Sequence, residues 1–441
     1  MRPSAEQGRL EHRGGPRDGE IIEGVVTGVD RDEKDPKAGK LRVDLGGASG
    51  VVELSLEPRY AKGPKPLAER FREGDLVRVR VASERPHGEG GALPLAFELG
   101  PQAAMVVMEP QTREILALVG GYDYHAGGFD RSQRAHRQPG SAFKPIVYTA
   151  AVEAKRITPA TIINDSPEVY ALWKPQNYEK EEFRGPIRVR TALAESINTV
   201  AVKVLSDIGL PQARAVATRV GITSPMPDDL GLSMALGAMT VTPIELANAY
   251  ATFASGGLHG DPVMIRNIGS EKLPPSKIEP ALPPEVAYVM VSLLRSVIDE
   301  GTARAASGKL RRPVAGKTGT TNRKSDTIDA WFVGFTPDLL AAVWVGFDDT
   351  RKLGRGETGA KAALPIWLDF MTKAVIGRPT KDFVQPPGVV VQRIDKTTGL
   401  LAAPGQETNT LDEVFLDGTA PTEQAPPQGQ ETSADKLLMG E

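Results

Sequence analysis

The chain has 441 residues, of which 25% are charged and 40% hydrophobic, and its formal net charge is −3 at pH 7. This length exceeds one ordinary domain and predicts two or three, while the near-neutral charge gives the whole chain no electrostatic attraction to nucleic acid. Cysteine is absent, which excludes thiol catalysis, disulfides and cysteine-ligated zinc. The five histidines show no metal-ligand spacing, so we expect no metal and no other cofactor.

The start of the chain, residues 1–18, is polar and Gly-rich and lacks the apolar core of a signal sequence, so we expect a disordered lead-in there. No apolar run approaches the length needed to span a bilayer; the longest, Leu339–Phe347, is typical of a buried strand. We therefore expect no membrane span in this chain. Either the protein is cytosolic, or the chain lacks an anchored segment.

Residues 19–100 are expected to form an all-β domain. They hold 15 acidic and 13 basic side chains but only three aromatic ones, whereas a nucleic-acid groove needs basic and stacking residues. We therefore favour a structural or protein-docking module over a nucleic-acid-binding one. Five short predicted strands, separated by Gly, Pro and charged clusters, suggest a small OB-like barrel: Ile21–Val29, Lys40–Leu45, Gly50–Leu54, Asp75–Ala82 and Leu93–Leu99.

Residues 101–378 are expected to form the main domain, of α+β class. Helical patterns fill the middle of this region, while strands lie at both of its ends, so we predict one antiparallel sheet joined across a helical insertion. Residues 379–441 are a predicted C-terminal extension, disordered from about residue 421. The predicted elements are the hairpin of Ala104–Glu109 and Glu114–Val119, the strands Pro313–Gly316, Ala330–Phe335 and Leu340–Phe347, and the helix Leu364–Val375.

The first chemical motif is a serine followed by a lysine three residues later, Ser141 and Lys144. A helix can begin at Ser141 because Pro145 then falls in its first turn, and residues three apart share a helix face, so the two side chains can meet. A serine becomes a nucleophile when a base removes its proton, and burial or a nearby like charge makes a lysine such a base. The spacing recurs at Ser433 and Lys436, so this motif alone is weak evidence.

Two further motifs follow along the chain. Ser196 could relay a proton between Lys144 and a leaving amine, and Asn198 could bind a substrate carbonyl through its NH₂ group. A cationic Lys317 with the hydroxyls of Thr318 and Thr320 suits a carboxylate, and Gly319 allows a ligand to approach the backbone. The backbone N–H groups of Ser141 and Thr320 could form an oxyanion hole.

The three motifs in this order are those of serine β-lactamases and penicillin-binding proteins. Over about residues 101–425 the chain resembles the transpeptidase part of class A, bifunctional penicillin-binding proteins, whose relatives also carry an OB-like domain. The resemblance extends beyond the motifs and rests on these segments: Gln138–Pro145, Leu236–Gly237, Val241–Ala254, Lys317–Asn322, Asp329–Pro337, Thr397–Leu401 and Gly418–Thr422.

The resemblance implies an antiparallel five-stranded sheet flanked by helices, with the active site at the sheet edge. It also implies a serine D,D-transpeptidase in which Ser141 attacks the D-Ala-D-Ala end of a peptidoglycan stem peptide, Lys144 takes its proton, and a second stem peptide accepts the acyl group. β-Lactams are expected to acylate Ser141. The implied location is the periplasmic, outer face of the bacterial inner membrane, and an activator protein is a candidate partner of the OB-like domain.

The chain also departs from the family. The glycosyltransferase domain and the N-terminal membrane helix of class A proteins are missing, so we interpret the chain as the C-terminal part of a bifunctional enzyme. Ile197 stands where β-lactamases that resemble this family have Asp, and no Glu-x-x-Leu-Asn segment lies between Asn198 and Lys317. Both observations favour a transferase. A D,D-carboxypeptidase or β-lactamase, and a non-catalytic penicillin-binding sensor or scaffold, remain as alternatives.

Two further features lie just before the first motif. The basic run of Arg131, Arg134 and Arg137 before the nucleophile favours a solvated loop over docking of acidic peptidoglycan. His136 lies five residues before Ser141 and is interpreted as a loop histidine, because no supporting triad spacing is visible.

Overall fold

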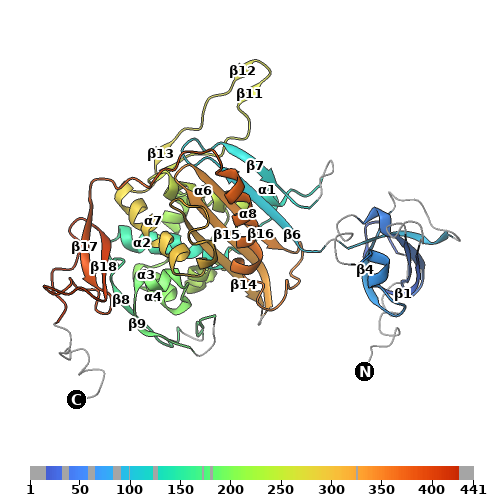
Figure 1. The fold of residues 1–441 in the computed structure, drawn as a ribbon, viewed down its shortest axis with the longest axis horizontal. Coiled ribbons are helices and arrows are strands. Elements are labelled where there is room, and N and C mark those ends of the chain that lie inside the picture. Colours follow the sequence, from blue (N-terminus) through green and yellow to red (C-terminus); the bar gives the residue numbers. More distant parts are fainter. Residues whose placement is uncertain are drawn as a thin grey trace. The chain divides into compact units, whose positions relative to one another are not determined.

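The computed structural model describes residues 16–31, 39–57, 65–82, 91–98, 100–122, 128–170, 173–178, 182–323 and 326–426. The chain divides into two compact units, Met1–Gly100 and Pro101–Glu441 (Figure 1). Within the described residues, no helix has both the length and the apolar character that crossing a bilayer requires.

The first unit is a closed five-stranded barrel. Its strand order is β1-β2-β3-β5-β4, and β3 and β5 pair in parallel while the other neighbours are antiparallel. Alternate residues of each strand point inward; in β4 the buried ones are Val77, Val79 and Val81. The strands agree with the predicted ones to within two residues: β1 Ile21–Asp30, β2 Lys40–Asp44, β3 Ser49–Glu53, β4 Leu76–Val81 and β5 Leu93–Phe97.

The second unit is built on a five-stranded antiparallel sheet, as predicted, with the order β14-β15-β16-β6-β7. Every residue of β16 is buried, which identifies it as a central strand covered on both faces. The edge strand β14 begins later than the predicted Pro313–Gly316 and continues to Arg323, so the Lys317 motif lies inside it. The strands are β6 Gln102–Met108, β7 Ile115–Val119, β14 Ala315–Arg323, β15 Asp326–Thr336 and β16 Leu339–Gly346.

Helices cover both faces of this sheet (Figure 1). Phe332 and Phe335 lie on opposite faces of β15 because side chains alternate along a strand. Phe332 packs edge-on against Trp367 of α8, while Phe335 packs against Tyr250 of α6. The helices are α1 Arg131–Arg134, α2 Lys144–Glu153, α3 Val189–Ala194, α4 Asn198–Ile208, α5 Leu210–Arg219, α6 Pro243–Ala254, α7 Pro284–Asp299 and α8 Leu364–Ala374, with short turns η4 Gly140–Phe143, η5 Asp228–Leu236, η6 Arg304–Ala306 and η7 Gly359–Ala363.

The C-terminal segment is folded onto the second unit rather than forming a separate extension. Its hairpin, β17 Val389–Asp395 and β18 Thr410–Leu416, is joined to α3 by a buried ion pair between Glu413 and Arg190. Arg190 also donates hydrogen bonds to Ser292 and Ser296 of α7. The fold continues past residue 421, where disorder was expected, because Ala425 is buried and its N–H donates to Leu401 O at 2.7 Å.

The predictions for residues 1–15 and 427–441 lie outside the described residues. Three smaller strand pairs complete the second unit: β8 Ile162–Asp165 with β9 Gly185–Arg188, β10 Leu258–His259 with β13 Glu279–Pro280, and β11 Asn267–Ile268 with β12 Glu271–Lys272.

Candidate active site

The predicted nucleophile, Ser141, lies on the 3-10 turn η4, and α2 begins three residues later at Lys144. The helix predicted to begin at Ser141 thus starts as a 3-10 turn and becomes α-helical at Lys144, with Pro145 in the first turn of α2. Side chains three residues apart eclipse one another in a 3-10 turn, so Ser141 and Lys144 still face the same side. Gly140 has φ +55°, and a Cβ there would lie 2.5 Å from Thr320 O, so the turn sits directly against β14.

The amine of Lys144 is fully buried and makes three hydrogen bonds. It donates to Ser196 O at 2.5 Å, to Asn198 Oδ1 at 2.6 Å and to Ser196 Oγ at 3.2 Å. Among the described residues, no hydrogen bond joins it to Ser141 Oγ. Burial, and after it the positive charge of Lys317, lowers the pKa of Lys144 well below the ordinary 10.5, which favours the neutral amine that a general base requires.

Ser196 owes its position to the way in which α3 ends. The Ile197 N–H donates to Ala192 O at 2.9 Å, and the Ser196 N–H donates to Leu193 O at 3.2 Å, which is the Schellman pattern of a helix C-terminus. That pattern requires a left-handed residue, usually Gly, but Ser196 occupies it with φ +61°. This strained backbone directs both the carbonyl and the hydroxyl of Ser196 toward Lys144.

Lys317 approaches the same hydroxyl from β14. Its amine is fully buried and donates to Ser196 Oγ at 2.9 Å and to Thr318 O at 3.2 Å. Burial lowers the pKa of Lys317 to about 7. The Ser196 hydroxyl therefore lies between two lysine amines, which gives a short path for a proton.

The rest of the third motif continues along β14. One hydrogen bond of 2.7 Å joins the Thr318 and Thr302 hydroxyls, and the Thr320 hydroxyl accepts one from the Gly359 N–H at 3.0 Å. Because a hydroxyl can donate as well as accept, the Thr320 proton is left to a ligand. A Cβ on Gly319 would lie 2.4 Å from Pro139 O, so glycine lets the nucleophile turn contact the strand.

The structure thus joins Lys144, Ser196, Asn198 and Lys317 by hydrogen bonds and places Ser141 on the adjoining turn. One hydrogen of the Asn198 amide is donated to Gln176 O at 2.7 Å, which leaves the other for the proposed carbonyl contact. The backbone N–H groups of Ser141 and Thr320 lie on the two segments that touch at Gly140.

Sequence reasoning missed the supports of this group. Asp165 and Asn177 hold the start of α4, and Thr302 and Gly359 hold the two threonines. These residues lie 16 to 39 positions from the residues they support, so no local spacing pattern indicates them. Only the polar character of Asp165, at the end of β8, and of Asn177 offered a signal.

The basic run before the nucleophile is solvated only in part, because Arg134 is exposed while Arg131 and Arg137 are held in ion pairs. Arg137 forms an ion pair with the buried Asp329 at 2.7 Å, and Arg131 forms one with Asp348 at 2.5 Å. Arg134 lies over the Phe129 ring at 5.3 Å. Burial raises the pKa of Asp329, and the Arg137 charge opposes this change. The run therefore anchors the nucleophile loop to the sheet.

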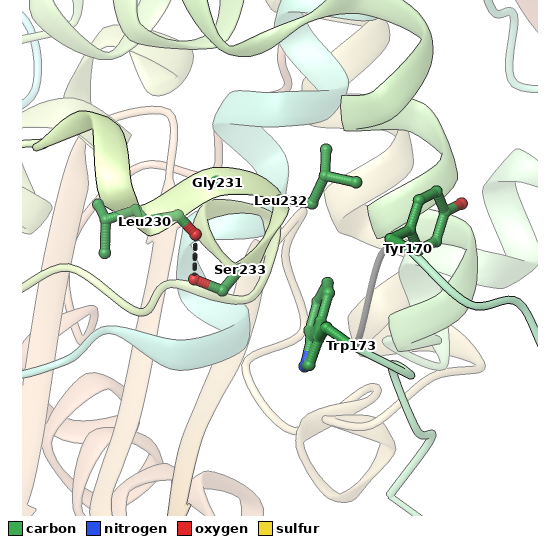
Figure 2. Close-up of a pocket in the computed structure, with 6 residues that line it drawn as sticks. All are labelled: Tyr170, Trp173, Leu230, Gly231, Leu232 and Ser233. Atoms are coloured by element: carbon green, nitrogen blue, oxygen red, sulfur yellow. Dashed lines mark hydrogen bonds between the residues drawn. The ribbon is translucent and has the colours of Figure 1, made fainter.

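An apolar groove with a volume of about 460 Å³ is lined by Tyr170, Trp173 and four consecutive residues of η5. Figure 2 shows Tyr170 and Trp173 facing the turn Leu230–Ser233 across it. The backbones of Tyr170 and Trp173 pair with each other. Three residues further on, the Gln176 carbonyl accepts a hydrogen bond from the Asn198 side-chain amide. The groove is thus linked to the second motif through the segment that runs from Trp173 to Gln176.

Comparison with known proteins agrees with this geometry. Residues 103–371 match the family model of the penicillin binding protein transpeptidase domain. The chain is similar to penicillin-binding protein 1A of Neisseria lactamica, with 39% identity over 354 residues that make up 76% of the chain and 43% of the relative. For penicillin-binding protein 1A of Pseudomonas aeruginosa the identity is 34% over 405 residues, 78% of the chain and 48% of the relative. The chain thus spans less than half the length of these curated relatives.

The fold is also similar to those of solved penicillin-binding proteins. The crystal structure of penicillin-binding protein 1A from Haemophilus influenzae matches with a TM-score of 0.69 and 27% identity over 96% of this chain and 67% of that one. The PonA1 protein from Mycobacterium tuberculosis in complex with penicillin V matches with a TM-score of 0.56 and 26% identity over 66% of this chain and 82% of that one.

Proposed function

The chain belongs to the penicillin-binding protein transpeptidase family, and we propose that it is a serine D,D-transpeptidase that cross-links peptidoglycan stem peptides. The observation that carries this proposal is the Ser196 hydroxyl held between two buried amines, 3.2 Å from Lys144 and 2.9 Å from Lys317, beside the turn that bears Ser141. This arrangement can move a proton between a nucleophile and a leaving amine without bulk water.

In the proposed acylation, Ser141 Oγ bonds to the carbonyl carbon of the penultimate D-Ala of a donor peptide. The neutral Lys144 amine takes the serine proton, and the peptide C–N bond breaks. Ser196 passes a proton from Lys144 to the nitrogen of the terminal D-Ala, which leaves as the free amino acid. Donors at the backbone N–H groups of Ser141 and Thr320 would stabilise the negative oxygen of the tetrahedral intermediate.

In the proposed second half-reaction, the amine of another stem peptide attacks the ester on Ser141. Its proton passes through Ser196 to Lys144, the C–O bond breaks, and Ser141 regains a proton as the new peptide bond forms. Lys317, Thr318 and Thr320 would bind the carboxylate of the donor peptide, while Gly319 and Asn198 would align its backbone.

Two further assignments follow from this function. Peptidoglycan precursors are cross-linked outside the cytoplasm, so the domain would act on the periplasmic face of the inner membrane. The barrel order β1-β2-β3-β5-β4 with a parallel β3–β5 pair supports an OB-like identity for the first unit. Its balanced charge favours a protein partner, such as an activator, over nucleic acid.

The test is intact-mass measurement after exposure to a fluorescent penicillin. We expect one adduct, mapped to Ser141 and absent from Ser141→Ala. Ser433→Ala is a matched control because Ser433 also precedes a lysine by three residues, and it should label normally. An unlabelled folded protein would refute the proposal. A donor peptide with a D-amino acid acceptor then separates transfer from hydrolysis. Hydrolysed product alone would identify a carboxypeptidase, and acylation by penicillin without any peptide product would identify a penicillin sensor.

A further inference from the structure

The helix that carries Asn198 is capped by a residue from a distant loop. α4 begins at Asn198, and its N-cap residue, Ile197, has no side-chain acceptor. The first N–H groups of a helix have no partner within the helix and need one elsewhere. Asn177 Oδ1 supplies it, accepting from the N–H groups of Asn198 at 3.0 Å and Thr199 at 3.3 Å.

Asn177 is itself held by a buried carboxylate. Its Nδ2 donates to the two oxygens of Asp165 at 3.0 and 3.1 Å and to Glu182 O at 3.3 Å. Asp165 is 1% exposed, and it also accepts hydrogen bonds from the Thr199 hydroxyl and from the Arg184 N–H. These donors fix the amide orientation of Asn177, because only its oxygen can face the helix when its NH₂ faces the carboxylate.

The start of α4 in turn holds the general base. Asn198 Oδ1 and Ser196 O are the two nearest acceptors of the Lys144 amine, at 2.6 and 2.5 Å. The same loop also holds the Asn198 side chain, because Gln176 O accepts a hydrogen bond from the Asn198 Nδ2 amide group. A shift of this helix end would therefore move Asn198 Oδ1 directly, and it would pull on Ser196, which lies two residues earlier in the chain.

We propose that Asn177 and Asp165 are positioning residues for the proposed transpeptidase reaction: they fix the first turn of α4 and thereby hold the Lys144 amine where it can take the proton of Ser141. Neither residue touches the reacting atoms. The inference rests on the proposed function of Ser141 and Lys144. In that reaction, the segments Ile162–Asp165 and Gln176–Asn177 would orient the general base, Lys144.

The test exchanges the two side chains. Asn177→Asp places a carboxylate against Asp165 and should slow penicillin acylation by about 100-fold, the cost of misplacing a reacting group by about 1 Å. The exchange Asp165→Asn with Asn177→Asp restores a donor–acceptor pair between them and keeps an oxygen facing α4, so it should recover at least about tenfold of this loss. Asn164→Asp makes the same chemical change at an exposed neighbour and should acylate at the wild-type rate.

The rate constant of acylation and the penicillin concentration at half-maximal rate are measured separately by rapid mixing. We expect most of the loss in the rate constant, because Lys144 acts in the chemical step, and a smaller change in the half-maximal concentration, because Asn198 also aligns the proposed substrate. A general loosening of the fold would not be repaired by the exchange. Circular dichroism checks that each variant is folded. If Asn177→Asp does not fold, the acylation rate constant of Asn177→Ser is measured instead, because the serine side chain is too short to reach the helix.

Wild-type acylation rates in Asn177→Asp or in a folded Asn177→Ser would overturn the inference, as would an exchange variant no faster than the single one. Failure of the proposed function is a different result, namely a wild-type protein that forms no adduct at Ser141.

Discussion

Lys317→Met should make the second unit more stable while removing its activity. Lys317 is fully buried, and burial lowers its pKa to about 7 from the ordinary 10.5. A protonated amine in this position therefore costs the folded state free energy that an unfolded chain does not lose. Methionine has a similar length and no charge, so it fills the same space without this cost.

The magnitude follows from the two pKa values. The gap between 10.5 and about 7 corresponds to roughly 5 kcal/mol at 1.36 kcal/mol per pKa unit. Methionine cannot make the hydrogen bond to Ser196 Oγ, which is worth about 1 kcal/mol, and Ser196 Oγ then lacks this donor. After both losses we expect the free energy of unfolding to rise by about 3 kcal/mol at pH 7.

The pH dependence has a definite sign. Between about pH 7 and pH 10.5 the unfolded chain holds the Lys317 proton, while the folded state has largely lost it. Stability of the wild type therefore rises with pH across this window through this group, and the cost is complete only below about pH 7. The advantage of Lys317→Met should shrink by more than half between pH 7 and pH 10.

Urea unfolding followed by tryptophan fluorescence measures this difference. The four tryptophans, Trp173, Trp331, Trp344 and Trp367, all lie in the second unit, so the signal reports that unit alone. Lys381→Met is the matched control because Lys381 is exposed, and its effect should stay within about 0.5 kcal/mol. A Lys317→Met variant less stable than wild type at pH 7, or a gap independent of pH, would refute the reasoning.

Two more predictions concern strain and burial. Ser196→Gly should be about 1 kcal/mol more stable than Ser196→Ala because Ser196 has φ +61°, although neither variant should acylate; equal melting temperatures would contradict the assigned strain. Glu413→Gln should cost about 3–5 kcal/mol in urea unfolding, since it leaves the buried Arg190 without its charge partner. The exposed pair of Lys373 and Asp369 provides the control: Asp369→Asn should cost less than about 0.5 kcal/mol, and similar costs at both pairs would contradict the role of burial.

The sequence was most informative where structure is local. The alternation of Val77, Val79 and Val81 fixes one face of β4, and the predicted barrel strands end within two residues of the observed ones. The motifs at Ser141 and Lys317 were also found from short spacings. In each case the physical cause acts between residues a few positions apart, so it leaves a pattern that can be read along the chain.

What the sequence did not predict depends on residues far apart in the chain. The pairing of β16 with β6 and the cap of α4 by Asn177 have no periodic signature. Ser196 shows a different limit. The residue that ends a helix in the left-handed conformation is usually Gly, so a serine at that position gives no sequence signal of the turn or of its strained backbone. Lys144 was expected beside Ser141, but its hydrogen bonds in this structure go to Ser196 and Asn198.

The glycine contacts around the nucleophile limit which substitutions this part of the fold can accept. A Cβ on Gly140 would lie 2.5 Å from Thr320 O, one on Gly237 2.2 Å from Gly140 O, and one on Gly319 2.4 Å from Pro139 O. Each contact is with backbone, which cannot swing aside as a side chain can. A side chain at any of these three positions would thus require the backbone to move, so a change in the shape of the nucleophile turn has to come from substitutions at other positions.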